Sequence, residues 1–212
     1  MSYQDLLKGY IPASAFSVKP GRRTVLDSRF LSVGEDQDGN VTLALVDMQP
    51  GFKDAIDKAT LDAAERQIKL AMRRGWAIVL VENAPWDNGR TYPQLRKHLM
   101  DGRGNWKYNR ACTVIKTTDG GGAQVIKACR AYGYPLQYFR VCGVYLDACV
   151  EQTVLGILKR IPGASVRCIR EAMNTNYLHE EAWESFPTRP YLVVSSELVD
   201  SAPCLSTTRA VA

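Results

Sequence analysis

The strongest indication of the fold comes from residues 141–153, which read VCGVYLDACVEQT. An apolar run rises to Gly143, a short turn follows, and a helical pattern begins at or near Cys149. Beyond it, apolar residues recur at the spacing of one buried helix face, at Val150, Val154, Ile157, Leu158 and Ile161. We therefore expect the Cys149 thiol at a helix N-terminus, where the helix dipole favours an anion and lowers the pKa of a thiol.

Strand and helix patterns alternate on both sides of this stretch. The run at 41–46 is continuously apolar, as expected of a strand covered on both faces. The patterns predict strands at 41–46, 76–81, 112–115, 136–142, 164–169 and 191–195. They predict helices at 60–74, 92–99, 123–132, from 149 onward and at 178–185. This alternation predicts a three-layer, doubly wound α/β fold, with a six-stranded, mainly parallel sheet and helices on both faces.

We expect one domain, residues 41–212, because no linker or repeat divides the pattern. Residues 1–40 are less regular and are expected to form an N-terminal extension that packs on the domain, with a short strand at 26–33.

Composition narrows the class of protein. With 212 residues, 46% of them hydrophobic and 23% charged, the chain is typical of a soluble globular protein. Its formal net charge of +5 is mild, and its basic residues are densest at 22–23, 73–74 and 103–110. No nucleic-acid motif accompanies them, so we interpret them as solvated surface and expect no nucleic-acid partner.

The chain shows no targeting or membrane segment. Its first residues lack the basic start and apolar core of a signal peptide, and no apolar run is long enough to span a membrane. The six cysteines are widely spaced, which favours free thiols in a reducing compartment over a disulfide framework. We therefore expect a cytoplasmic protein without a membrane partner.

Three reactive residues follow predicted strands. Asp47 comes directly after the first strand, Lys116 after the third, and Cys149 opens the helix after the fourth. Taken singly, each has an ordinary structural interpretation: a turn aspartate, a solvated lysine and a core cysteine. Because the carboxyl ends of parallel strands meet at one edge of the sheet, we expect the three together, as base, cation and nucleophile.

At this point the sequence resembles the isochorismatase-like cysteine hydrolases. Residues 45–52, LVDMQPGF, are similar to the first-strand motif of that family, and residues 141–153 are similar to its nucleophile motif. The resemblance covers roughly residues 41–200. It implies a six-stranded parallel sheet, an Asp47–Lys116–Cys149 triad, a covalent thioester intermediate and a dimer or tetramer of identical chains. It also implies a cis peptide between Val144 and Tyr145, and an oxyanion hole made by the N–H groups of Tyr145 and Cys149.

The sequence departs from the family pattern in three places. The stretch 81–88, where nicotinamidases of the family carry metal-binding histidines, contains no histidine, so we expect no metal and no other cofactor. Glycines 120–122 replace the Ser-Ala-Phe that often follows the lysine, and Leu146 replaces a threonine. The glycines are either a helix-entry turn or a loop that approaches a ligand closely. Loop residues expected at the active edge are candidates for lining a substrate pocket: Gln49, Phe52, Trp86 and Tyr145.

The predicted function is hydrolysis of a carbon–nitrogen bond in a small amide or a carbamoyl (ureido) compound through a Cys149 thioester. Two alternatives stay open. One is a catalytically idle binding or assembly protein on the same scaffold, and the other is an isochorismatase-type vinyl-ether hydrolase. The latter reaction does not need a cysteine nucleophile.

Overall fold

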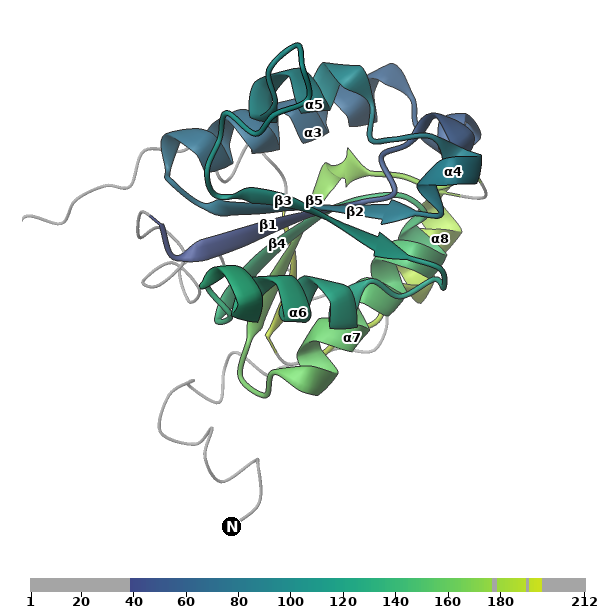
Figure 1. Ribbon diagram of the computed structural model, residues 1–212. Helices are drawn as coiled ribbons and strands as arrows, with labels where there is room; N and C mark the ends of the chain where they lie inside the picture. The colour runs from purple at the N-terminus through teal and green to yellow at the C-terminus, as the bar shows by residue number, and fades with distance from the viewer. Residues whose placement is uncertain (1–38, 177–178, 190, 196–212) are drawn as a thin grey trace, which may run out of the picture.

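The computed structural model describes residues 39–176, 179–189 and 191–195 (Figure 1). The expected N-terminal extension and its strand at 26–33 fall on residues outside these ranges, except for residues 39 and 40. Within the described part of the chain, no helix is both long enough and apolar enough to cross a membrane.

Six parallel strands form one sheet, in the order β3-β2-β1-β4-β5-β6. The predicted fold class is confirmed, and every strand pair in this sheet is parallel. The strands are β1 (Val41–Val46), β2 (Ala77–Asn83), β3 (Ala111–Lys116), β4 (Tyr138–Gly143), β5 (Ser165–Met173) and β6 (Leu192–Ser195).

Helices cover both faces of the sheet and make three layers (Figure 1). One face packs against α3 (Lys58–Arg73) and α5 (Pro93–Leu99). The other packs against α6 (Gly122–Tyr132), α7 (Glu151–Arg160) and α8 (His179–Ser185). Shorter elements follow strand ends: the 3-10 helix η3 (Pro50–Ala55), α4 (Pro85–Asn88) and the π-helical turn η4 (Leu146–Val150).

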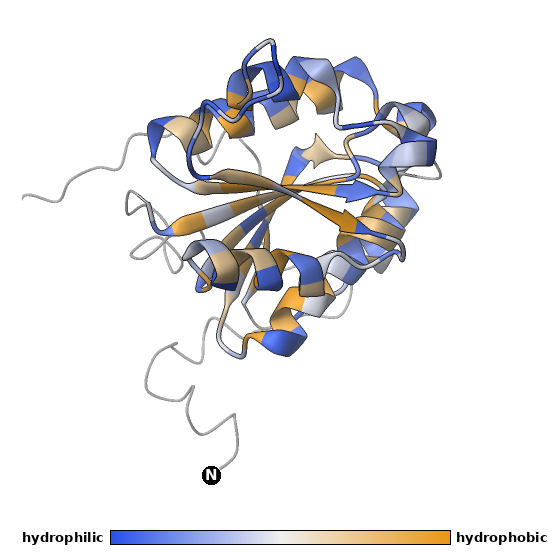
Figure 2. Ribbon diagram, in the orientation of Figure 1, coloured by the Kyte–Doolittle hydropathy of each residue, from blue (hydrophilic) through white to orange (hydrophobic). Residues whose placement is uncertain are grey.

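The helix boundaries follow from local chemistry. The Asp57 carboxylate caps α3 by accepting a hydrogen bond from the backbone N–H of Thr60 at 2.7 Å. Gly133 ends α6 in the left-handed conformation, with φ +66°. The helices turn apolar residues toward the sheet and hydrophilic residues outward (Figure 2). The sheet is therefore sandwiched between two apolar layers.

The order of the strands reverses between β1 and β4, which lie side by side although β2 and β3 separate them in sequence. In doubly wound sheets, ligands bind beyond the carboxyl ends of the strands at this reversal. Asp47 follows β1, and the turn that carries Cys149 follows β4. The topology thus brings the two residues to the same place.

Gly143, at the end of β4, allows these two strand ends to approach closely. Its φ is +132°, and a Cβ atom there would lie 2.0 Å from the carbonyl oxygen of Val46 on β1. The next N–H group, that of Val144, donates to the same carbonyl at 3.0 Å. A side chain at position 143 would therefore push the turn that carries Cys149 away from β1.

Gly143→Ala is expected to lower the free energy of unfolding by more than about 3 kcal/mol, because the methyl group has no room beside β1. Gly133→Ala is the matched control: its φ is also positive, but nothing lies within 4 Å of a Cβ there. We expect a loss of only about 1–2 kcal/mol at position 133. Urea denaturation followed by circular dichroism measures both; equal losses would contradict the close-approach explanation.

Candidate active site

Asp47 sits in an unusual backbone conformation directly after β1. Its φ is +54°, and its N–H group donates to the carbonyl of Val81 on β2 at 2.9 Å. The residue is fully buried, at 0% exposure. Among the residues that the structure describes, neither carboxylate oxygen of Asp47 accepts a well-directed hydrogen bond. Charge therefore holds this carboxylate in place, and the carboxylate keeps the capacity to accept a proton.

Lys116 reaches that carboxylate from the end of β3. Its Nζ atom lies 2.8 Å from Oδ2 of Asp47, and both side chains are fully buried. The ammonium group also donates to the Thr118 carbonyl at 3.0 Å and to the Cys149 sulfur at 3.3 Å. The ammonium group is thus stabilised by one ion pair and two hydrogen bonds, which is how a buried ammonium group is retained.

Cys149 lies within the π-helical turn η4, four residues after the cis peptide bond between Val144 and Tyr145. The sequence predicts a helix that begins at or near this cysteine; in the structure the cysteine lies in the π-helical turn, and the regular helix α7 starts two residues later. The turn is anchored at its start, where the Leu146 N–H donates to the Asn174 carbonyl at 2.9 Å. Cys149 is 5% exposed, so it is buried but not completely closed off from the surface.

The glycine loop packs closely against β2 and against α7, the helix that follows Cys149. A Cβ at Gly121 would lie 2.6 Å from the Val81 side chain, and a Cβ at Gly122 would lie 2.7 Å from the Thr153 carbonyl. Gly122 is the first residue of α6. Of the two interpretations of this loop, its position therefore favours the helix-entry turn, and the missing side chains allow α6 to lie close to α7.

Thr153 connects the two halves of the site, although sequence reasoning gave it no role. Its hydroxyl donates to the Cys149 carbonyl at 2.7 Å and accepts from the Gly121 N–H at 2.9 Å. The signal was present in the sequence: a polar residue four positions after the cysteine, on the buried helix face. The Thr118 group that binds Lys116 is a backbone carbonyl, so the identity of the side chain there could not have indicated it.

The environment of Cys149 raises the pKa of its thiol, the opposite of what the helix dipole predicts. Burial and the neighbouring Asp47 carboxylate raise that pKa to about 12, and they outweigh the opposing effect of Lys116. Burial also raises the pKa of Asp47, against the lowering effect of Lys116. The resting site is therefore a neutral thiol beside a carboxylate–ammonium pair.

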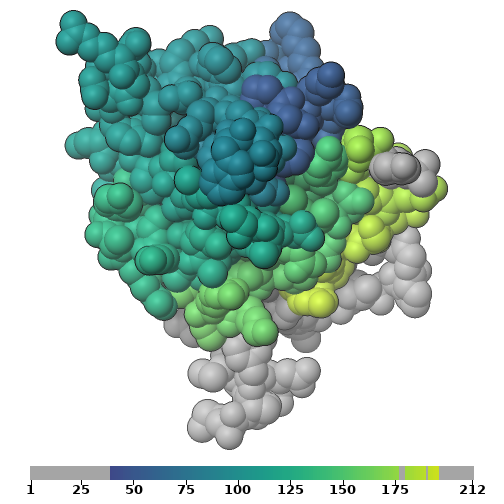
Figure 3. Space-filling view, turned by 45° about the vertical axis from the view of Figure 1, so that its right-hand side comes forward, coloured from purple at the N-terminus to yellow at the C-terminus, as the bar shows by residue number. Residues whose placement is uncertain are grey.

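The four candidates for the substrate pocket have different surroundings. Phe52 and Tyr145 are half-buried and pack edge to face, with ring centroids 5.7 Å apart. Gln49 is fully buried, and its side-chain amide binds the backbone of Asn83 and Gly89. Trp86 is exposed on α4. Figure 3 shows this face of the molecule, where the loops that follow β1, β2 and β3 meet later parts of the chain, drawn in green and yellow-green.

The residues after β2 do not fit a metal ion. Gln49 binds the Asn83 N–H and carbonyl, and the Asn88 side chain donates to the same carbonyl at 2.9 Å. These amide groups are occupied by the backbone. No group of three or more His, Cys, Asp or Glu residues with metal-binding geometry occurs among the described residues.

Comparison with known proteins places the fold. No protein-family model matches the chain, and neither does any curated protein sequence. Solved structures do match, and three of them, with different activities or family names, are described below.

The MAR1 ribonuclease of Caenorhabditis elegans is 20% identical, with a TM-score of 0.57 over 71% of this chain and 72% of that chain. The nicotinamidase of Staphylococcus aureus is 14% identical, with a TM-score of 0.60 over 74% of this chain and 99% of that one. An isochorismatase-family protein of Burkholderia thailandensis is 14% identical, with a TM-score of 0.57 over 76% and 93% of the two chains. The chain therefore has the isochorismatase-like α/β fold, as its motifs imply.

Asp47→Asn is expected to make Cys149 more reactive toward iodoacetamide at pH 8. Without the carboxylate, the thiolate becomes the partner of the buried Lys116 ammonium, so the pKa of the thiol falls. Well below that pKa, each unit of decrease gives about ten times more thiolate. Lys116→Met should act in the opposite direction, and asparagine tolerates the positive φ at position 47.

Alkylation rates of individual cysteine peptides, measured by mass spectrometry, test this. Cys112 is the internal reference, because burial raises the pKa of its thiol to about 12 independently of the site. A Cys149 rate that falls in Asp47→Asn, with the fold intact by circular dichroism, would contradict the charge arrangement.

Proposed function

We propose that the protein is a cysteine hydrolase of the isochorismatase-like family that cleaves a carbon–nitrogen bond in a small amide or carbamoyl compound. One observation carries the proposal: the Lys116 ammonium lies 2.8 Å from the Asp47 carboxylate and 3.3 Å from the Cys149 sulfur, in a buried site. A core cysteine needs neither neighbour. The slight exposure of Cys149 suits a small substrate.

The proposed reaction begins with transfer of the thiol proton from Cys149 to Asp47. The sulfur attacks the substrate carbonyl carbon, and the carbonyl oxygen becomes an oxyanion. When the intermediate collapses, the carbon–nitrogen bond breaks and Asp47 returns the proton to the leaving amine. Water then attacks the thioester carbon, and Asp47 accepts a proton from that water. The carbon–sulfur bond breaks, the Cys149 sulfur takes the proton from Asp47, and the acid product is released.

Electrostatics favour this sequence of charges. The raised pKa of Asp47 brings the carboxyl group closer to the basicity needed for a proton shuttle. Lys116 stays beside the pair and stabilises the thiolate as it forms. The backbone N–H groups of Tyr145 and Cys149 are the proposed oxyanion donors, and each such donor contributes about 3–4 kcal/mol in comparable sites.

Two alternatives make different predictions. A vinyl-ether hydrolase would not require the sulfur of Cys149, and an idle binding protein would require no turnover at all. The nicotinamidase among the structural neighbours acts on an amide, which is consistent with the proposed bond class. The ribonuclease among them does not share that bond class, so substrate choice rests on the site geometry. Assembly into a homo-oligomer and a cytoplasmic location stay predictions.

Cys149→Ala is expected to lower turnover by about 10³-fold or more, because the nucleophile acts in every step. The assay is a screen of small amides, ureas and carbamoyl compounds for ammonia release. Cys142→Ala is the matched control: it removes another buried thiol, near the end of β4, and should stay active if it folds. Full activity of Cys149→Ala on an identified substrate would rule out the thioester route.

Removal of metal ions is expected to change neither turnover nor thermal stability, because the side-chain amides of Gln49 and Asn88 are already hydrogen-bonded to the backbone. Metal analysis of the purified protein and its melting temperature with and without EDTA test this independently of any substrate. A stoichiometric transition metal whose removal lowers the melting temperature would overturn the metal-free mechanism.

A further inference from the structure

The net positive charge of this protein comes from one segment. Residues 90–110 contain six Lys and Arg residues and a single acidic residue, Asp101. The other residues of the chain contain 21 Lys and Arg and 21 Asp and Glu. The whole formal net charge of +5 therefore belongs to residues 90–110, and the remainder of the molecule is balanced.

This segment forms a groove beside the edge strand β3. It runs through α5 and a loop, closed by an antiparallel bridge between Met100 and Trp106, before entering β3. Two hollows, of about 330 and 420 Å³, share Arg96, Met100 and Gly104 in their walls. They therefore adjoin each other. We call them together the basic groove; its defining side chains are Arg90, Arg96, Lys97, Trp106, Lys107 and Tyr132.

The acidic residues of the groove are already engaged. Glu82 is 1% exposed and is held by Arg90 at 3.0 Å and by the Thr91 N–H at 2.9 Å. The Asp101 carboxylate accepts the backbone N–H groups of Arg103 and Asn105, at 2.8 and 2.9 Å.

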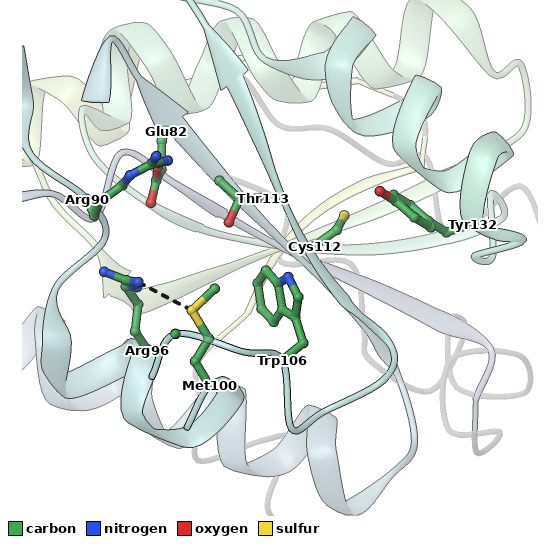
Figure 4. Close-up of a pocket in the computed structure, with 9 residues that line it drawn as sticks. Glu82, Arg90, Arg96, Met100, Trp106, Cys112, Thr113 and Tyr132 are labelled. Atoms are coloured by element: carbon green, nitrogen blue, oxygen red, sulfur yellow. Dashed lines mark hydrogen bonds and ion pairs between the residues drawn. The ribbon is translucent and has the colours of Figure 1, made fainter. Parts of the chain in front are cut away.

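The lysines and arginines are less fully neutralised. Lys97 pairs with Glu65 of α3 at 3.4 Å. Arg96, in contrast, donates to a neutral atom, the Met100 sulfur, at 3.4 Å (Figure 4). Within the described residues, neither Arg96 nor Lys107 has an ion-pair partner. The groove therefore presents uncompensated positive charge.

Exposed aromatic rings gather at the same place. Trp106 is 38% exposed and Tyr132 is 63% exposed, and both line the first hollow. In Figure 4 the two arginines lie at one end of this hollow and Tyr132 at the other, with Trp106 between them. Ile115, another exposed apolar residue, follows on β3. An exposed ring such as Trp106, in a hollow that arginines also line, offers a stacking surface in a cationic setting.

A second copy of the chain fits this surface poorly. A twofold interface brings the same patch of both chains together, so one net charge of +5 would face another. A polyanion with planar rings instead satisfies both features of the groove. Proteins that bind single strands combine a positive groove with aromatic side chains on which bases stack.

We propose that the basic groove binds single-stranded nucleic acid, through its phosphates at Arg96 and Lys107 and through base stacking on Trp106. This differs from the sequence-based expectation of no nucleic-acid partner, which rested on the lack of a nucleic-acid motif around the basic clusters. The groove uses none of the triad residues, so this inference is independent of the proposed hydrolase activity.

Fluorescence anisotropy with a labelled single-stranded oligonucleotide of about 15 nucleotides tests the proposal. At about 50 mM salt we expect micromolar affinity that weakens steeply as salt increases. Arg96→Gln and Lys107→Gln should each weaken binding and reduce the slope of log affinity against log salt by about 0.7. Lys159→Gln, at the exposed end of α7, is the charge-matched control and should change the slope less.

Trp106→Ala tests stacking and should weaken binding about fivefold or more. Trp86→Ala removes the other exposed tryptophan, which does not line the groove, and should leave affinity unchanged. An abasic oligonucleotide of equal length should bind more weakly than the normal one. Cys149→Ala should bind as tightly as the wild type, whether or not it has lost turnover.

Several results would overturn the proposal. These are no binding at low salt, equal binding of the abasic strand or of polyphosphate, and unchanged affinity in all three groove variants. A shift in oligomeric state of Arg96→Gln or Lys107→Gln without oligonucleotide, measured by light scattering, would assign the groove to self-association instead.

Discussion

The ion pair between Asp47 and Lys116 is the constraint on which the rest of the site depends. Two charges buried this completely are retained only when each compensates the other, and removing one partner from such a pair costs about 3–5 kcal/mol. The pair joins the ends of β1 and β3 across β2. It also fixes the state of Cys149, since the carboxylate keeps the thiol protonated while the ammonium group favours its ionisation.

Close backbone contacts bring these three groups together. Gly143 lets the end of β4 bring the turn that carries Cys149 against β1, and the glycines at the start of α6 let that helix pack on α7. Thr153 then hydrogen-bonds both the Cys149 turn and the glycine loop. Rigid elements therefore position every group that the proposed chemistry uses, while half-buried aromatic rings, Phe52 and Tyr145, lie nearby.

The buried site and the basic groove lie in different parts of the molecule. The buried triad lies where the strand order reverses, in the middle of the sheet, whereas the net positive charge lies along the outer strand β3. A buried site of balanced charge suits a small neutral substrate. An exposed groove of unbalanced charge suits an extended anion, and its contacts do not disturb the internal ion pair.

The sequence alone determined the layered α/β fold, because strand and helix periods follow directly from which residues must be buried. It also indicated Asp47, Lys116 and Cys149, because reactive residues directly after strands converge in a parallel sheet. Only the tertiary structure decided the π-helical turn at Cys149, the carbonyl of Thr118 that holds the lysine and the raised pKa of the thiol. These depend on burial and on contacts between segments far apart in the chain, and single-residue patterns carry no record of either.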